Sequence, residues 1–232
     1  MNKPVVNEIL DGSPGGFIEA VKRTLVVSLR RAFTDSGLSL NDSRLHVDME
    51  YPDEQASYPA AWVQFSFTNL TDSGLGHIES MTGENGEVGE VRQWRYEGQV
   101  TITFMALSSL DRDRISDKFI SIYSFSDIGD PPVIKRRERP HPQLFQELAK
   151  SPYVSMSLQS GLLRPRGQNT SVGTPWDSGQ LVYEDSYVFG LEGEFQQVYI
   201  PGEGYKLRRI DIVPEHSEFF TDNHRSNNGG WV

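Results

Sequence analysis

Few side chains of the sequence form a combination that could support catalysis or ligand binding, and the first such group lies near residue 110. Asp111 and Asp113 alternate with Arg112 and Arg114. Two carboxylates in a cleft could act as the acid and the base of a hydrolytic reaction. At the start of a helix, favourable interaction with the helix dipole and solvated ion pairs explain the same residues more simply. We therefore expect a structural role for this group.

The histidines and glycine-rich segments give no stronger signal. His216 and His224 lie among acidic residues that could complete a metal site, but polar residues in a terminal tail need no such explanation. Residues 12–16 precede a predicted helix, as phosphate-binding loops do, but the Lys-Ser/Thr pair of a P-loop does not follow. We predict no catalytic, metal or cofactor site and a protein that is not an enzyme.

The alternative to a protein that is not an enzyme is a carboxylate-based hydrolase of a cell wall. Its support is the abundance of acidic and aromatic side chains, which can form sugar-binding clefts. No pair of carboxylates stands out as its catalytic centre.

One run of basic side chains is set in a proline-rich segment, residues 130–142. The run consists of Lys135, Arg136, Arg137 and Arg139. It could contact phosphates, but Glu138 and prolines interrupt it and no aromatic residue alternates with it for base stacking. We favour docking of this arm on an acidic face of an adjacent copy over contact with DNA.

Composition limits the partners of the chain. The 232 residues carry a formal net charge of -10, and the chain has no cysteine. An acidic surface repels DNA and anionic membranes, so DNA could slide past without specific binding. The missing cysteines exclude a disulfide framework and fit synthesis in a reducing cytoplasm. No signal peptide or membrane-spanning segment is expected.

The first predicted element is an amphipathic helix over residues 16–35. Its apolar residues recur every four positions: Phe17, Val21, Leu25, Leu29 and Phe33. Val26 and Val27 break the pattern, because they fall close to Arg30 and Arg31 on the polar side. They are either scattered surface valines or part of a second face that contacts a neighbouring subunit.

Alternating polarity predicts strands over residues 45–49, 61–67 and 94–106. Residues 72–90 read as a long polar hairpin with its tip near 83–86, which is either mobile or bound by a partner. A second helix follows Ser108 and ends before Gly129. Its buried face is predicted to contain Ile115, Phe119, Ile122 and Tyr123.

The second half of the chain is predicted to contain a short helix over residues 142–150, a possible strand over 153–158 and a loop over 160–180. Three strands follow, over 181–190, 193–200 and 205–213, with turns at 191–193 and 201–204. The whole is α+β: a mainly antiparallel sheet packed by two principal helices, with a long hairpin and a C-terminal β-meander. The predicted regions are an N-terminal arm (1–15), an α+β core domain (16–125), an insertion with arm, short helix and loop (126–180), the meander (181–214) and a C-terminal tail (215–232).

Residues 94–123 (WRYEGQVTITFMALSSLDRDRISDKFISIY) resemble the central part of the tail terminator proteins of long-tailed bacteriophages. The helix at 16–35 and the proline-bounded aromatic strand at 58–65 (YPAAWVQF) match the same family in kind. The resemblance covers roughly residues 14–125, and residues 126–232 exceed what a minimal terminator needs.

The resemblance implies a structural virion protein, assembled in the host cytoplasm and placed at the tail–neck junction. It implies a homohexameric ring that caps the tail tube, stops its growth and offers a surface to a head–tail connector or neck protein. Another neck or tail component, such as a head–tail joining or tail completion protein, is the alternative. The residues expected at the contacts between subunits are Val26, Val27, Arg30, Arg31, Glu84, Asn85, Glu87, Lys135, Arg136, Arg137 and Arg139.

Overall fold

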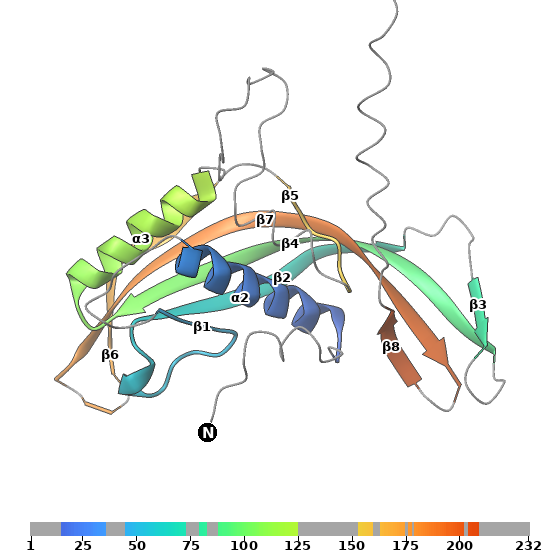
Figure 1. Ribbon diagram of the computed structural model, residues 1–232, viewed down its shortest axis with the longest axis horizontal. Helices are drawn as coiled ribbons and strands as arrows, with labels where there is room; N and C mark the ends of the chain where they lie inside the picture. Colours follow the sequence, from blue (N-terminus) through green and yellow to red (C-terminus); the bar gives the residue numbers. More distant parts are fainter. Residues whose placement is uncertain are drawn as a thin grey trace, which may run out of the picture.

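The computed structural model of the protein describes residues 15–35, 45–72, 79–82, 88–124, 153–159, 163–174, 176–177, 179–201 and 204–208. Within these residues, helices α2 (Phe17–Asp35) and α3 (Ser109–Ser124) pack on one 8-stranded sheet (Figure 1). The strands are β1 (His46–Asp48), β2 (Ala60–Asp72), β3 (Glu79–Thr82), β4 (Val88–Ala106), β5 (Ser157–Leu158), β6 (Arg164–Gly173), β7 (Leu181–Ile200) and β8 (Gly204–Arg208), and a 3-10 turn, η1 (Gln55–Ser57), precedes β2.

Two long antiparallel strands, β4 and β7, form the centre of the sheet. Their pairing runs from Glu90 opposite Tyr199 to Ala106 opposite Tyr183. Strands β2 and β3 pair with the outer edge of β4, whereas β5, β6 and β8 pair with the outer edge of β7. Only the short β1–β2 contact is parallel among the described pairings. The predicted fold class, α+β with a mainly antiparallel sheet and two principal helices, is confirmed.

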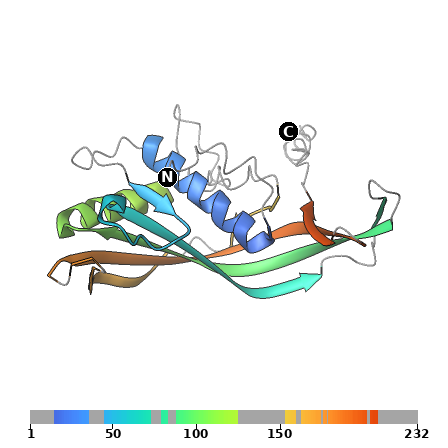
Figure 2. The same ribbon diagram turned by 90° about the horizontal axis from the view of Figure 1, so that it is seen from below.

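Both helices cover the same face of the sheet, as Figure 2 shows. The apolar positions predicted on each helix pack there against inward residues of β2, β4 and β7, and all but the partly buried Phe17 are buried. Helix α2 begins where the Gly16 carbonyl accepts the Ala20 N–H at 3.0 Å. The Glu19 carboxylate accepts the N–H of Gly15 at 2.8 Å, which satisfies a further donor at this helix end. Neither described helix is long and apolar enough to cross a membrane.

Helix α2 is buried on more than its apolar stripe. Val26 and Val27 are each only 2% exposed, so the interpretation as scattered surface valines is wrong. Thr24 and Ser28 are buried beside them, and their hydroxyls donate to the carbonyls four residues earlier at 2.8 and 2.7 Å. These local bonds let hydroxyl groups sit in the interior without unpaired donors. Because the two valines offer almost no surface to a second molecule, they are interior residues of this chain.

The predicted loop over residues 160–180 contains a strand, β6, so this part of the prediction is wrong. Its glycine and proline content indicated a loop, but β6 lies at the outer edge of β7 with mostly exposed side chains. Its pairing shifts register between Pro165 and Gly167 and again between Gly167 and Thr170. Edge positions and bulges tolerate proline, which cannot donate to the hydrogen-bond ladder, and glycine, which weakens a strand interior.

The predicted turn at residues 191–193 is also wrong, because β7 runs unbroken through it. Gly193 lies opposite Tyr96 in the register of β4 and β7. A Cβ atom at this glycine would lie 1.9 Å from the Ser155 carbonyl oxygen. The glycine therefore permits the close approach of another segment and makes no turn. Strand β7 is central, so the predicted boundary between core and C-terminal meander separates strands of one sheet.

Other predicted features are confirmed where the structure describes them. Residues 79–82 pair with 88–91 as the predicted hairpin, and β8 follows β7 through the predicted turn near 201–204. The predicted strand at 153–158 is limited to β5 and a bridge from Val154 to Phe195. The hairpin tip, the arm at 130–142, the short helix at 142–150, most of the N-terminal arm and the C-terminal tail lie outside the described residues.

Candidate functional site

The central strands extend well beyond the layer of helices. Helix α2 has 19 residues and β7 has 20. A helix of that size spans about 28 Å, whereas such a strand spans about 66 Å. One end of the sheet consequently projects past α2, as Figures 1 and 2 show. We call this end the strand arm: β3, residues 88–94 of β4, residues 195–200 of β7, and β8.

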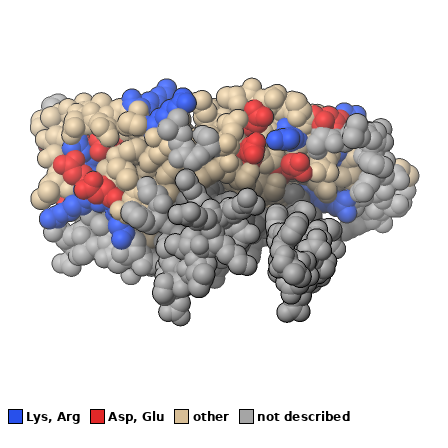
Figure 3. Space-filling model, turned by 90° about the horizontal axis from the view of Figure 1, so that it is seen from above, with Lys and Arg blue, Asp and Glu red and all other residues tan. Residues whose placement is uncertain are grey.

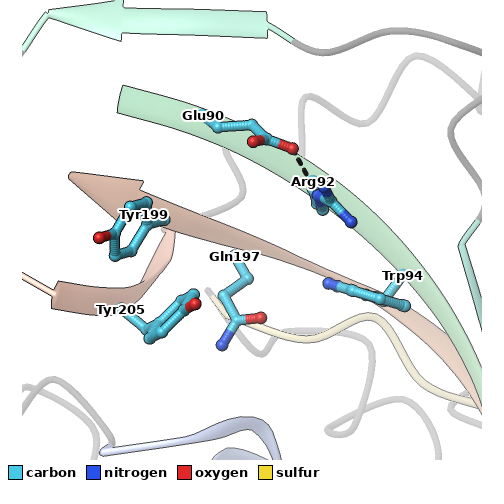
Figure 4. A pocket seen from close by; sticks show the side chains of 6 residues that line it. All are labelled: Glu90, Arg92, Trp94, Gln197, Tyr199 and Tyr205. Atoms are coloured by element: carbon cyan, nitrogen blue, oxygen red, sulfur yellow. Dashed lines mark hydrogen bonds and ion pairs between the residues drawn. The ribbon is translucent and has the colours of Figure 1, made fainter. Parts of the chain in front are cut away.

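A groove lies on the strand arm, on the side of the sheet that the helices occupy elsewhere. It encloses about 270 Å³, close to the lower limit of ordinary ligand sites. Six side chains from β4, β7 and β8 line it: Glu90, Arg92, Trp94, Gln197, Tyr199 and Tyr205 (Figure 4). We call it the aromatic groove.

The strand periodicity places these side chains on one face. Residues 90, 92 and 94 alternate along β4, as 197 and 199 do along β7, so each set points to the same side. Phe17, the first residue of α2, stacks on Phe195 of β7 with ring centroids 4.4 Å apart. The groove begins on the next outward positions of β7, where the helical layer ends.

The three aromatic rings differ in exposure. Tyr199 and Tyr205 are cross-strand partners with centroids 4.7 Å apart, and Tyr205 is 70% exposed. Trp94 is partly buried and packs against the main core. Its indole Nε1 is buried and has no hydrogen-bond partner among the described residues. Figure 4 shows the nitrogen edge of this ring turned toward Gln197. A buried donor without an acceptor costs free energy, and a ligand carbonyl could remove that cost.

The charges of the groove balance. The Arg92 guanidinium donates to the Glu90 carboxylate in an ion pair on the strand surface. This hydrogen bond and the negative charge of Glu90 raise the pKa of Arg92. The pair leaves the aromatic faces, the Trp94 donor and the amide of Gln197 as the groups that could select a ligand.

The residues of the groove were not predicted as a site. Four of them, Trp94, Gln197, Tyr199 and Tyr205, lie in predicted strands, but the register that brings Trp94 opposite Phe195 joins segments about 100 residues apart in the chain. The available signal was a set of tyrosine and tryptophan residues at alternate positions near strand ends.

Four of the predicted contact residues, Val26, Val27, Arg30 and Arg31, are described, and all four lie on α2. Arg30 donates from its guanidinium to the Val47 carbonyl at 3.1 and 2.7 Å, which ties β1 to α2. Burial lowers the pKa of Arg30, and the nearby Asp48 carboxylate opposes that effect. Arg31 is half-buried on the same helix. Glu84, Asn85, Glu87, Lys135, Arg136, Arg137 and Arg139 lie outside the described residues.

The alternating acidic and basic residues 111–114 lie at the start of α3, as predicted, but not all of them form the predicted solvated ion pairs. Helix α3 starts where the Arg112 N–H donates to the Ser108 carbonyl at 3.1 Å, and Asp111 pairs with Arg114 at 3.4 Å on the surface. The expectation of solvated ion pairs is wrong for Arg112, whose side chain is 3% exposed. Its Nε lies 3.5 Å from Oδ1 of the buried Asp185.

Asp185 is the centre of this buried polar cluster. It accepts the Ser116 hydroxyl at 2.8 Å and the Asn169 backbone N–H at 2.9 Å. Arg112 also donates to the side-chain oxygen of Asn169. The cluster joins α3, β6 and β7, and its burial closes it to a substrate. Its role is to hold the fold together.

A second pocket near β1 bears on the hydrolase alternative. It encloses about 70 Å³, roughly the space of two water molecules, and is too small for a sugar. His46 Nε2 lies 4.0 Å from the Asp48 carboxylate at its edge. Among the described residues, no group of three or more His, Asp or Glu side chains could hold a metal ion.

Comparison with known proteins assigns neither a family nor a function to the chain. No protein-family model matches the chain, and no curated protein matches it. The strand arm and its aromatic groove are the described surface best suited to binding.

Proposed function

We propose that this protein is a structural subunit that assembles with copies of itself into a ring. In the form that the sequence resemblance implies, the ring is the hexamer of a phage tail terminator, which caps the tail tube and joins it to the head or neck. The observation that carries the proposal is the strand arm, a part of the sheet that the chain's own described helices do not cover.

The arm has the properties of a surface that a partner buries. Its strands end in exposed apolar and aromatic side chains, among them Val88, Tyr199 and Tyr205. Short strand arms gain little stability by themselves, because one face lacks a packed layer. Contact between the arm of one copy and a different surface of the next is heterologous, and such contacts close into rings when the rotation permits.

The charge distribution supports passage of DNA without binding. The chain carries a net charge of -10. On the side seen in Figure 3, basic and acidic side chains of the described residues lie in mixed groups, over α3 at one end and over the far half of the sheet at the other, and one small group of basic side chains lies alone at the upper edge. Mixed groups of this kind do not form the continuous basic stripe that holds a phosphate backbone.

The test combines mass measurement with binding to tail tubes. Native mass spectrometry or mass photometry of the purified chain should show a closed oligomer, alone or after addition of a phage tail tube protein. Electron microscopy should then show density at one end of the tubes and tubes that no longer lengthen. A chain that is strictly monomeric at high concentration and does not bind tube ends would contradict the proposal. Immunogold labelling at another layer of the virion would reassign it to another neck or tail component.

A further inference from the structure

We infer that the aromatic groove binds the proline-rich basic segment, residues 130–142, of a neighbouring copy. The inference rests on the proposed function, because it names the partner of the strand arm.

The groove offers the chemistry that proline-rich chains require. Proline rings pack on flat aromatic faces, and grooves lined by tryptophan and tyrosine are a recurrent means of binding such segments. Trp94, Tyr199 and Tyr205 supply three such faces within one groove. A peptide unit before a proline has a carbonyl acceptor but no N–H, so the ligand needs donors from the protein.

The buried donor of Trp94 fits that requirement. Its Nε1 is buried and has no acceptor among the described residues, the ring lines the groove, and its nitrogen edge is turned toward Gln197 (Figure 4). Gln197 adds an amide that can donate to a second carbonyl. An incoming backbone carbonyl would satisfy the indole N–H, which no purely apolar occupant could do.

The composition of residues 130–142 matches the rest of the groove. The segment contains Pro131, Pro132, Pro140 and Pro142. It also carries four basic and two acidic side chains, which give it a formal charge of +2. The whole chain carries -10, so the rest of the chain carries -12. That difference attracts the segment to another copy. Its guanidinium groups can stack on the exposed face of Tyr205.

The absence of cysteine from the sequence makes a direct cross-linking test clean. Val88 is 66% exposed and lies on β4 two residues before Glu90, on the same face. Val88→Cys and Val133→Cys are prepared as separate full-length proteins, mixed and oxidised. The expected result is a disulfide-linked pair containing one of each.

The matched control replaces Val172, a 45% exposed valine on the edge strand β6, far from the arm. Val172→Cys mixed with Val133→Cys should cross-link at no more than a tenth of the yield, since no binding brings the thiols together. Equal yields from the two mixtures would overturn the inference. So would a Val88→Cys, Val133→Cys double variant that forms its disulfide only within one chain.

A binding measurement distinguishes binding of the segment in the groove from a cross-link that forms only because the two cysteines lie close together. A labelled peptide of residues 129–143 is titrated into the full-length protein and followed by fluorescence anisotropy. Trp94→Phe, which keeps an aromatic face but replaces the indole with a smaller ring that has no N–H, should weaken binding roughly tenfold. Tyr205→Ala, at an exposed site that should not disturb folding, should also weaken it. Unchanged affinity in both variants would contradict the proposed occupant.

The two proposals fail in distinguishable ways. A ring that assembles normally, with neither peptide binding nor the Val88–Val133 cross-link, overturns this inference and leaves the proposed function standing. Peptide binding with no ring under any condition overturns the proposed function, and the groove is then a peptide site of another assembly.

Discussion

At the residue scale, Asp185 is a buried polar side chain whose loss should harm the fold. It sits between Arg112, Ser116 and the Asn169 backbone in the interior. Asp185→Ala removes the buried carboxylate that faces the buried Arg112 guanidinium and leaves the Ser116 hydroxyl without its acceptor, which costs about 3–5 kcal/mol of unfolding free energy. Urea unfolding followed by circular dichroism measures this loss.

Asp113 provides the matched control, because it also pairs with Arg112 but its side chain is 55% exposed. Asp113→Ala should cost no more than about 1 kcal/mol, as exposed ion pairs do. Similar losses in the two variants would show that burial does not set the strength of this cluster.

Tyr123 should make the fold sensitive to alkaline pH. Burial on α3 raises the pKa of its hydroxyl to about 12, above the ordinary value near 10. Its contribution to stability is complete below pH 10, where folded and unfolded chains both keep the proton. Between pH 10 and 12 the unfolded chain loses its proton first, so stability falls.

Tyr123→Phe removes this titration. We therefore expect a smaller fall in unfolding free energy from about pH 9 to about pH 11.5 in Tyr123→Phe than in the unaltered chain. Urea titrations at the two pH values provide the comparison, and other groups that titrate cancel between the proteins. An identical fall in both would exclude Tyr123 as a source of alkaline instability.

At the element scale, Gly193 controls how residues 153–159 pack on β7. A Cβ atom there would lie 1.9 Å from the Ser155 carbonyl oxygen and 2.8 Å from the Tyr96 hydroxyl oxygen. Gly193→Ala should cost at least about 1–3 kcal/mol through overpacking. Hydrogen exchange should speed up at the Ser155 N–H, which donates to the Glu194 carbonyl at 2.8 Å.

Gly173, at the end of β6, is the control for that substitution. No atom lies within 4 Å of the position its Cβ would take. Gly173→Ala should change stability by less than about 1 kcal/mol. A loss in Gly193→Ala as small as this would show that the segment at 153–159 moves aside freely.

How much of each element could be predicted depends on whether its signal is local. The periodicity of Val21, Leu25 and Leu29 predicted α2 because a helix buries a stripe that its own sequence defines. The continuity of β7 could not be predicted, since Gly193 reads as a turn until Ser155 is known to lie against it. The aromatic groove needed the register of β4 with β7, which no local pattern contains.

At the scale of the whole molecule, the strand arm should matter for assembly and little for the fold of one copy. Tyr205 is 70% exposed, so Tyr205→Ala should change unfolding free energy by no more than about 0.5 kcal/mol. If the arm is the contact between copies, the same change should lower the fraction of ring in mass photometry. Val172→Ala, exposed on β6, should leave both quantities unchanged. A ring population unaffected by Tyr205→Ala would place the contact elsewhere.

The pairing of β4 with β7 also determines when the sheet can form during synthesis of the chain. Strand β4 ends at Ala106, but the strand that completes the centre of the sheet begins only at Leu181. A ribosome must therefore release most of the chain before the sheet can close, and contacts this distant in sequence form slowly. Until then the long edge of β4 lacks a partner and is prone to aggregate. We expect chains truncated before residue 181 to accumulate as insoluble protein.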